Sequence, residues 1–167
     1  MSIAQSLLPE FDQEMAGTRK VLDRLPDDKF GWKPHAKSMS LGQLANHLAH
    51  MATWGAITVE QASFDVAPVD GPPVETPKAA SRAEVLEHFD AGAKKFRTLL
   101  EATSDAAMME NWSLLMAGKP LMTMPRIAVL RGMVMNHIIH HRAQLTVYYR
   151  LNDIPVPGLY GPSADEK

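Results

Sequence analysis

The feature that most constrains the fold of this chain is a pair of histidines, His137 and His141, within its last long segment of periodic apolar residues. If this segment is a helix, residues four apart lie on one face, and their side chains come within about 5–6 Å of each other. One metal ion can span that distance when a third ligand comes from elsewhere. The fold must therefore bring another element, with another ligand, against this face.

The segment around the pair has the spacing of an amphipathic helix. Its apolar stripe comprises Ile127, Leu130, Val134, Ile138, Leu145 and Tyr148. His137 and His141 lie within the stripe, and Gln144 borders it. His140 projects roughly 100° away from the centre of the stripe. Only two of the three clustered histidines are therefore expected to face the core.

Three earlier segments have similar helical spacing. Residues 3–25 carry one apolar stripe. Ser40 and Gln43 have the capping-box spacing for a second helix, and Ser81 and Glu84 have it for a third. Four long amphipathic helices predict an all-α fold, a four-helix bundle.

The second helix supplies a candidate third ligand. Around the helix axis, the direction of His47 lies between those of Leu44 and Met51, well inside the buried face of this helix. His50 falls roughly 120° from the centre of that face, towards solvent. His47 is therefore the inward histidine.

The connections between helices differ in length. Residues 65–78 are proline-rich and without periodicity, which predicts a long crossover or a lid between the second and third helices. Ala117-Gly118-Lys119 separates two short apolar runs and indicates a possible short hairpin before the fourth helix. Pro125 is expected in the first turn of that helix. We expect a single domain over residues 1–167, with an irregular tail from about residue 152.

Histidines that face the core need polar side chains, water or a metal as partners, because the backbone groups of a helix are already hydrogen-bonded to one another. If no metal is bound, the inward histidines form hydrogen bonds with one another, with water, or with the polar side chains Gln43, Asn46, Gln144 and Tyr148. The presence of His47 on a second helix favours a metal site instead.

Other catalytic motifs are missing from the sequence. The zincin signature fails because Ile138 stands where the glutamate after the first histidine belongs. Glu84 and His88 are four apart, not three as in ferritin-like dimetal sites. There is no Gly-rich phosphate loop and no Gly-x-Ser-x-Gly elbow.

Composition narrows the function further. The net charge of −2 gives no electrostatic reason to expect nucleic acid or an anionic membrane as partner. No apolar run reaches the ~18 residues of a membrane span, and no secretory signal is visible, so we expect a cytoplasmic protein. The absence of cysteine leaves His, Asp and Glu as metal ligands and excludes a cysteine nucleophile. Seven of the eleven methionines lie between Met108 and Met135, and they fit either core filling or an adaptable cavity wall.

Several motifs together resemble the DinB family of the DinB/YfiT-like superfamily. They are residues 136–144 (NHIIHHRAQ), residues 40–47 (SLGQLANH) and residues 32–34 (WKP). The tail, residues 152–166, also resembles that of one subgroup. The resemblance implies a four-helix bundle, often dimeric, that holds a divalent metal through three histidines.

Carried over by motif, the three ligands are His47, His137 and His141, the residues that helical geometry selects. One departure is Ala143, where the family often has glycine before Gln144. The resemblance implies chemistry like that of relatives that are thiol-dependent transferases and isomerases, in which the metal activates the thiol of a small cofactor.

The leading hypothesis is a metal-dependent enzyme of the thiol-dependent S-transferase type, acting on a small molecule as a homodimer. Zinc or nickel is the expected metal, and a low-molecular-weight thiol the expected cofactor. Asn46, Gln144 and Tyr148 are candidates for supporting the ligands, and no catalytic residue is assigned. The alternatives are a metal-activated hydrolase and a non-catalytic metal-binding scaffold of the stress response.

Overall fold

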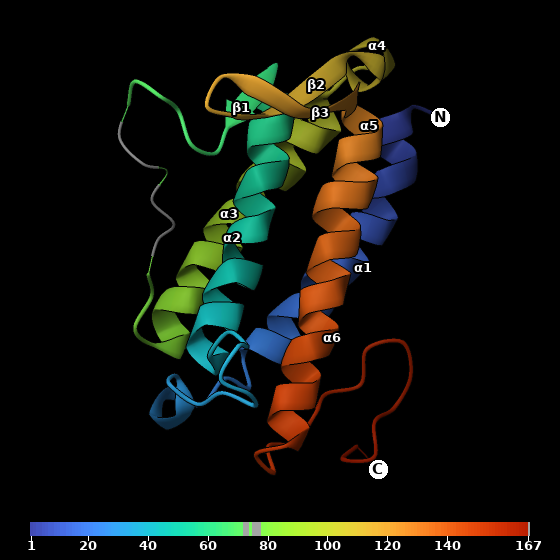
Figure 1. Cartoon of the computed structure of the whole chain (residues 1–167). Coiled ribbons are helices and arrows are strands. Elements are labelled where there is room, and N and C mark those ends of the chain that lie inside the picture. Colours follow the sequence, from blue (N-terminus) through green and yellow to red (C-terminus); the bar gives the residue numbers. More distant parts are fainter. Residues whose placement is uncertain (72–73, 75–77, 167) are drawn as a thin grey trace.

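A computed structural model describes residues 1–71, 74 and 78–166. Four long helical segments lie side by side (Figure 1). They are α1 (Ile3–Leu22), α2 (Leu41–Glu60), α3 (Arg82–Ala102), and a continuous run of α5 (Arg126–Ala128), η2 (Val129–Met135) and α6 (Asn136–Arg150). Two short helices, η1 (Asp27–Lys29) and α4 (Asp105–Met109), lie in the connections.

The helices begin largely where the capping residues predict. Ser40 accepts the backbone N–H of Gln43 at 3.1 Å, and the Gln43 side chain accepts that of Ser40 at 2.8 Å, which confirms this capping box. Ser81 caps α3, but the Glu84 side chain accepts the N–H of Ala80, so this box is only half formed.

Three short strands form one sheet in the part of the chain that the structure describes. Strand β2 (Asn111–Met116) pairs in parallel with β1 (Ser63–Asp65) and antiparallel with β3 (Lys119–Pro125). The sheet covers one end of the helices (Figure 1). The molecule is therefore mostly helical with a small sheet, and the expected all-α class was incomplete.

The expected hairpin is confirmed as β2–β3. Its two turn residues, Ala117 and Gly118, have φ values of 51° and 73°, as a type I′ turn requires. Asp65 of β1 braces this turn, because its carboxylate accepts the N–H of Gly118 at 2.7 Å. This hydrogen bond is the main cause of the lowered pKa of Asp65. Strand β3 continues to Pro125, so the proline precedes the helix and does not lie in its first turn.

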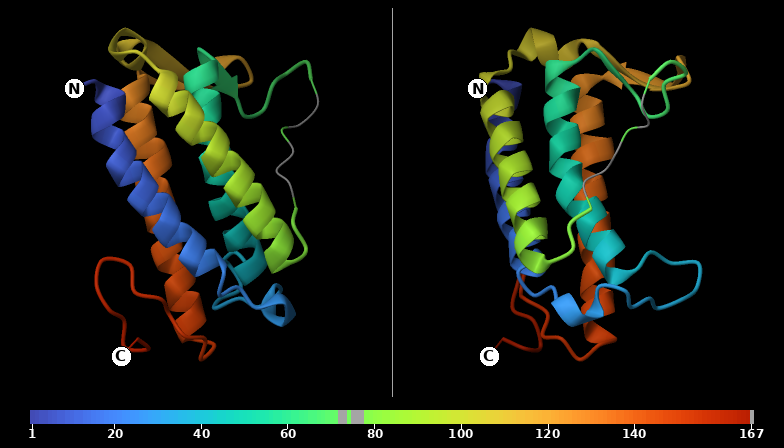
Figure 2. Two further views of the ribbon diagram at one scale, coloured as in Figure 1. Left: turned by 180° about the vertical axis from the view of Figure 1, so that it is seen from behind. Right: turned by 90° about the vertical axis from the view of Figure 1, so that its left-hand side faces the viewer.

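Helices α2 and α3 run in the same direction, from the end that holds the chain's C-terminus to the end covered by the sheet (Figure 2). The connection between them must therefore return along the length of the helices. The predicted crossover at residues 65–78 lies partly outside the described residues, which omit 72–73 and 75–77.

The core lies between the four helical segments. Phe11 and Phe96 meet edge to face with ring centroids 4.9 Å apart. Tyr149, and not Tyr148, completes the buried stripe of α6, and its hydroxyl donates to the Val21 carbonyl at 2.8 Å. The methionines of the segment between Met108 and Met135 differ in burial. Met108 and Met135 belong to the core, whereas Met109 and Met116 are exposed.

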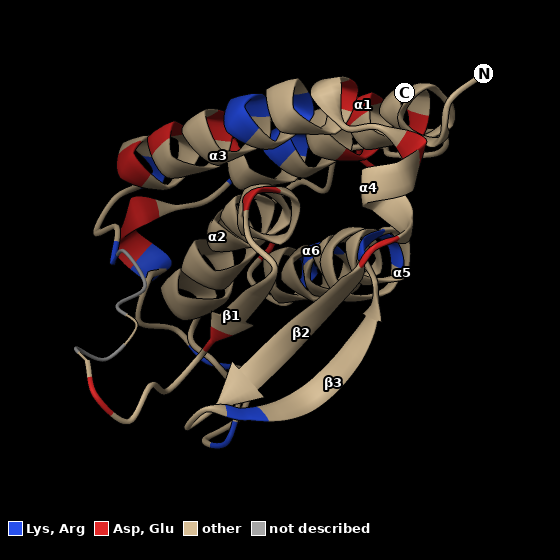
Figure 3. Cartoon of the chain, turned by 90° about the horizontal axis from the view of Figure 1, so that it is seen from above, with Lys and Arg blue, Asp and Glu red and all other residues tan. Residues whose placement is uncertain are grey.

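Charged side chains are distributed unevenly over the helices. Viewed from above, Lys, Arg, Asp and Glu gather on α1 and α3, while α2 and α6 are mostly free of them (Figure 3). In the sequence of α2, Glu60 is the sole residue of these four types. No helix within the described residues is long and apolar enough to cross a membrane.

Candidate metal centre

Three histidines from two helices converge where α2 packs against α6. The Nε2 atom of His137 lies 2.7 Å from Nε2 of His141 and 3.4 Å from Nε2 of His47. The three ligand atoms all lie within 4.8 Å of one another, close enough to hold a metal ion. The structure thus brings together the three histidines selected from the sequence.

The spacing of these nitrogens fits a small divalent ion. Zn–N bonds of 2.0–2.1 Å at tetrahedral angles place two ligand nitrogens about 3.3 Å apart. The His47–His137 separation of 3.4 Å agrees with this value. The His137–His141 separation of 2.7 Å must open by about 0.6 Å to reach this value, which rotations of the two side chains can provide.

The site also holds its histidines in the protonation state that a metal needs. Burial, with the neighbouring imidazoles His141 and His137, lowers the pKa of His47 to about 4. Burial is likewise the main cause of the lowered pKa values of His137 and His141. Neutral imidazole is the form that ligates metals, so all three are ready at neutral pH.

A hydrogen bond at the far side of one ring directs its Nε2 atom into the site. His141 Nδ1 donates to Gln144 Oε1 at 2.7 Å. For His137, the nearby Met133 carbonyl partly opposes the lowering of the pKa by burial. His141 Nε2 then presents a lone pair towards His137 Nε2, which lies 2.7 Å away. In this tautomer the lone pair of His141 Nε2 is available to a metal ion held by the triad.

A π-helical segment, η2, ends at Met135, two residues before His137. At its end, the N–H of Asn136 bonds the Arg131 carbonyl, five residues back, in place of the usual four. π-helical turns inside helices occur frequently at functional sites. Sequence periodicity did not predict this segment, because no residue preference separates a π-turn from an α-helical one.

The other two supporting candidates use their polar groups elsewhere. The Asn46 side chain bonds the Gly42 carbonyl and both backbone groups of Ala79. The Tyr148 hydroxyl donates to the Met39 carbonyl at 3.3 Å. Among the three candidates, Gln144 is the one that contacts a triad histidine.

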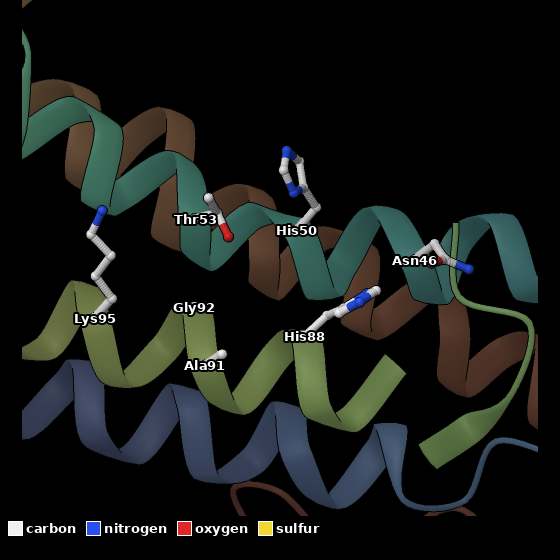
Figure 4. Close-up of a pocket in the computed structure, with 7 residues that line it drawn as sticks. All are labelled: Asn46, His50, Thr53, His88, Ala91, Gly92 and Lys95. Atoms are coloured by element: carbon white, nitrogen blue, oxygen red, sulfur yellow. The ribbon is translucent and has the colours of Figure 1, made fainter. Parts of the chain in front are cut away.

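The remaining histidines lie outside the triad. His140 is exposed, as expected, although its ring centroid lies 4.9 Å from that of His141. His50 and His88 line a separate hollow of about 290 Å³ between α2 and α3. The hollow is also lined by Asn46, Thr53, Ala91, Gly92 and Lys95 (Figure 4).

This hollow does not continue the triad site. Its lining comes from α2 and α3, whereas the triad lies between α2 and α6. The His50 ring points away from α3 in Figure 4. The Lys95 ammonium is already paired with Glu60 at 2.8 Å.

Comparison with known proteins agrees with the site and the fold. Residues 10–145 match the family model of the DinB superfamily. The chain is 28% identical over 160 residues to the uncharacterized protein YrdA of Bacillus subtilis, covering 95% of this chain and 89% of that protein.

Two solved structures have a similar fold. A DinB-like protein from Bacillus cereus superposes with a TM-score of 0.74 at 23% identity, covering 95% of this chain and 98% of that one. The DinB-like protein YjoA from Bacillus subtilis gives a TM-score of 0.68 at 16% identity, covering 97% and 98%. At these identities the structures support the fold alone. Because the family match spans most of the chain, including all three triad histidines, the chain belongs to the DinB superfamily.

Proposed function

We propose that this protein is a divalent-metal-dependent enzyme of the thiol-dependent S-transferase type. His47, His137 and His141 would hold the metal, and we propose zinc or nickel among the ions that imidazole ligands suit, which also include copper and iron. The observation that carries the proposal is the convergence of three neutral imidazoles whose ligand atoms lie within 4.8 Å of one another.

The protein's own residues prepare this centre. Gln144 orients the His141 ring, and burial favours the neutral form of all three imidazoles. Three protein ligands are the number typical of catalytic sites, which keep a coordination position for a small molecule. When bound, a divalent ion would supply the positive charge that favours the thiolate form of a small thiol.

The thiol must come from outside the chain, because the sequence has no cysteine. His47 and His137 are only partly buried, so a small thiol and a small electrophilic substrate can reach the centre from solvent. The proposal places the protein in the cytoplasm, where low-molecular-weight thiols are kept reduced.

The proposal also covers architecture and assembly. We class the helical part, a single domain, as a four-helix bundle of the DinB/YfiT type, with the small sheet as a cap over one end. Helix α2 has no Lys, Arg or Asp and a single Glu, Glu60, and a helix this poor in charge is one that a second copy of the chain can cover, so we propose a homodimer. Light scattering on purified protein tests this, and a monomer at micromolar concentration would contradict it.

The first experiment measures metal content. Purified, tag-free protein is incubated with Zn²⁺ or Ni²⁺, desalted and assayed by elemental analysis. We expect close to one equivalent per chain, and His141→Ala should retain its fold but lose the metal. Less than about a tenth of an equivalent in the wild type would refute the metal centre.

The second experiment separates the reaction classes. The metal-loaded protein is assayed against a panel of small thiols and electrophiles, with and without thiol. A transferase requires the thiol. Turnover that is independent of thiol indicates a metal-activated hydrolase, and metal binding without turnover indicates a non-catalytic scaffold.

A further inference from the structure

Helix α6 presents different side chains to two neighbours. His137 and His141 meet His47 of α2, whereas Arg142 meets α1 and the C-terminal segment. The Arg142 side chain is only 2% exposed, so its charge is almost entirely removed from water. A buried guanidinium is tolerated when its charge is paired and its N–H groups are hydrogen-bonded.

Helix α1 supplies the paired charge. Arg142 Nη2 lies 2.6 Å from Oε2 of Glu14, whose side chain is 7% exposed. Arg142 Nη1 donates to the Glu14 carbonyl at 3.0 Å and to the Thr18 hydroxyl at 3.4 Å. Gly17 permits this approach, since a Cβ atom there would lie 3.0 Å from Arg142 Nη1.

The C-terminal segment completes the arrangement through Tyr160. Its hydroxyl accepts from Arg142 Nη2 at 2.6 Å and lies 2.9 Å from each carboxylate oxygen of Glu14, to which it donates. Its ring centroid lies 5.4 Å from Arg142 Cζ, within the range of a cation–π contact. The Tyr160 hydroxyl therefore contacts both members of the buried ion pair, Arg142 and Glu14.

We propose that Arg142, Glu14 and Tyr160 form a positioning clamp that sets the rotation of α6 and couples the C-terminal segment to the metal centre. This inference rests on the proposed metal site. Arg142 follows His141 directly, so a rotation of α6 that loosens the clamp also displaces the His141 ring. At an outer helix radius of about 5–6 Å, a rotation of about 20° moves a side chain by about 2 Å. Functional sites need their groups placed to within about 0.5 Å.

Coupling of this kind is reciprocal. If the clamp favours metal binding, metal binding must by the same factor favour the clamped position of the C-terminal segment. The inference therefore predicts two effects: loss of the Tyr160 hydroxyl weakens metal binding, and metal protects the segment around Tyr160 from hydrogen exchange.

The first test measures zinc affinity by competition with a chelator in the wild type and in Tyr160→Phe, which removes the hydroxyl and keeps the ring. We expect affinity to fall about tenfold, within the usual range of coupling between sites. The control is Asp165→Asn, which breaks the ion pair of the same segment with Arg150 at 2.6 Å and does not touch Arg142. Its zinc affinity should stay within about twofold of wild type.

The second test needs no substitution in the clamp. Hydrogen–deuterium exchange of residues 154–166 is compared with and without zinc in the wild type and in His47→Ala. We expect zinc to slow exchange in the wild type only. This readout also covers the case in which Tyr160→Phe fails to fold.

The outcomes separate the coupling from the metal site. If the wild type binds zinc, but Tyr160→Phe binds it equally and exchange is unaffected, the coupling is overturned while the metal site stands. A lower melting temperature of Tyr160→Phe with unchanged zinc affinity assigns the clamp a purely structural role and overturns the inference too. If the wild type takes up no zinc, the metal site itself is refuted, and the coupling with it.

Discussion

At the scale of single residues, Gln144 is the side chain that controls a ligand without being one. Its Oε1 atom fixes the Nδ1–H tautomer of His141 and leaves Nε2 free for a metal. Partners of this kind typically change metal affinity by about 10–100-fold when removed. We therefore expect Gln144→Leu to weaken zinc binding by that factor, measured by chelator competition.

The control for this substitution is Thr146→Ala. Thr146 is on the same helix, and its hydroxyl donates only to the nearby Ala143 carbonyl. Zinc affinity should be unchanged in this variant. Equal affinity in Gln144→Leu and in the wild type would show that the His141 tautomer is set by something else.

At the residue scale, the sequence predicts the face of a helix on which a side chain lies. The inward directions of His47, His137 and His141 follow from 100° per residue, and the structure brings them together. The buried pair of Glu14 and Arg142 was missed, because each looks like an ordinary surface charge until its partner, 128 residues away in sequence, is known.

At the scale of elements, α2 and α3 pack closely because Gly55 has no side chain. A Cβ atom there would lie 2.2 Å from Cε1 of Phe96, which is fully buried. Overpacking of this kind costs about 1–3 kcal/mol. We expect Gly55→Ala to lower the free energy of unfolding by this amount, measured by urea denaturation.

Gly132 provides the matched control for helix propensity. It is also helical, and a Cβ atom there meets nothing within 4 Å. Gly132→Ala should be neutral, or stabilising by up to about 1 kcal/mol. If both substitutions had the same effect, close packing against Phe96 would not be the reason for glycine at position 55.

The hairpin depends on a second contact between elements. Asp65 of β1 accepts the N–H groups of Gly118 and Ala67, which ties the parallel strand to the turn of β2–β3. We expect Asp65→Ala to speed hydrogen exchange in residues 111–125 while exchange in α1 and α3 stays unchanged. Faster exchange throughout the chain would mean that the sheet and the helices unfold as one unit.

Helices and strands could be predicted where their own residues have a characteristic pattern. The long helices have apolar periodicity, and the hairpin has its glycine turn. Strand β1 has three residues, too few for an alternating pattern, and it forms because β2 offers a free edge. The π-helical segment was missed because its buried residues Leu130 and Val134 keep the four-residue spacing of an α-helix.

At the scale of the whole molecule, the packing of distant helices brings the three histidines of the candidate metal site together. His47 is ninety positions before His137, and they meet because α2 and α6 pack in the finished fold. The unfolded chain therefore holds no formed triad, and a metal that binds there must stabilise the folded state by mass action.

This linkage gives a prediction for the complete protein. Free Zn²⁺ at about 100 times its dissociation constant should stabilise the fold by about 2.7 kcal/mol. For a chain of this size, that corresponds to a rise in melting temperature of about 5–10 °C. His47→Ala should not show the rise, and Mg²⁺ should not cause it in the wild type, because Mg²⁺ prefers oxygen ligands. If zinc raised the melting temperature equally in the wild type and in His47→Ala, the ion would bind outside the triad.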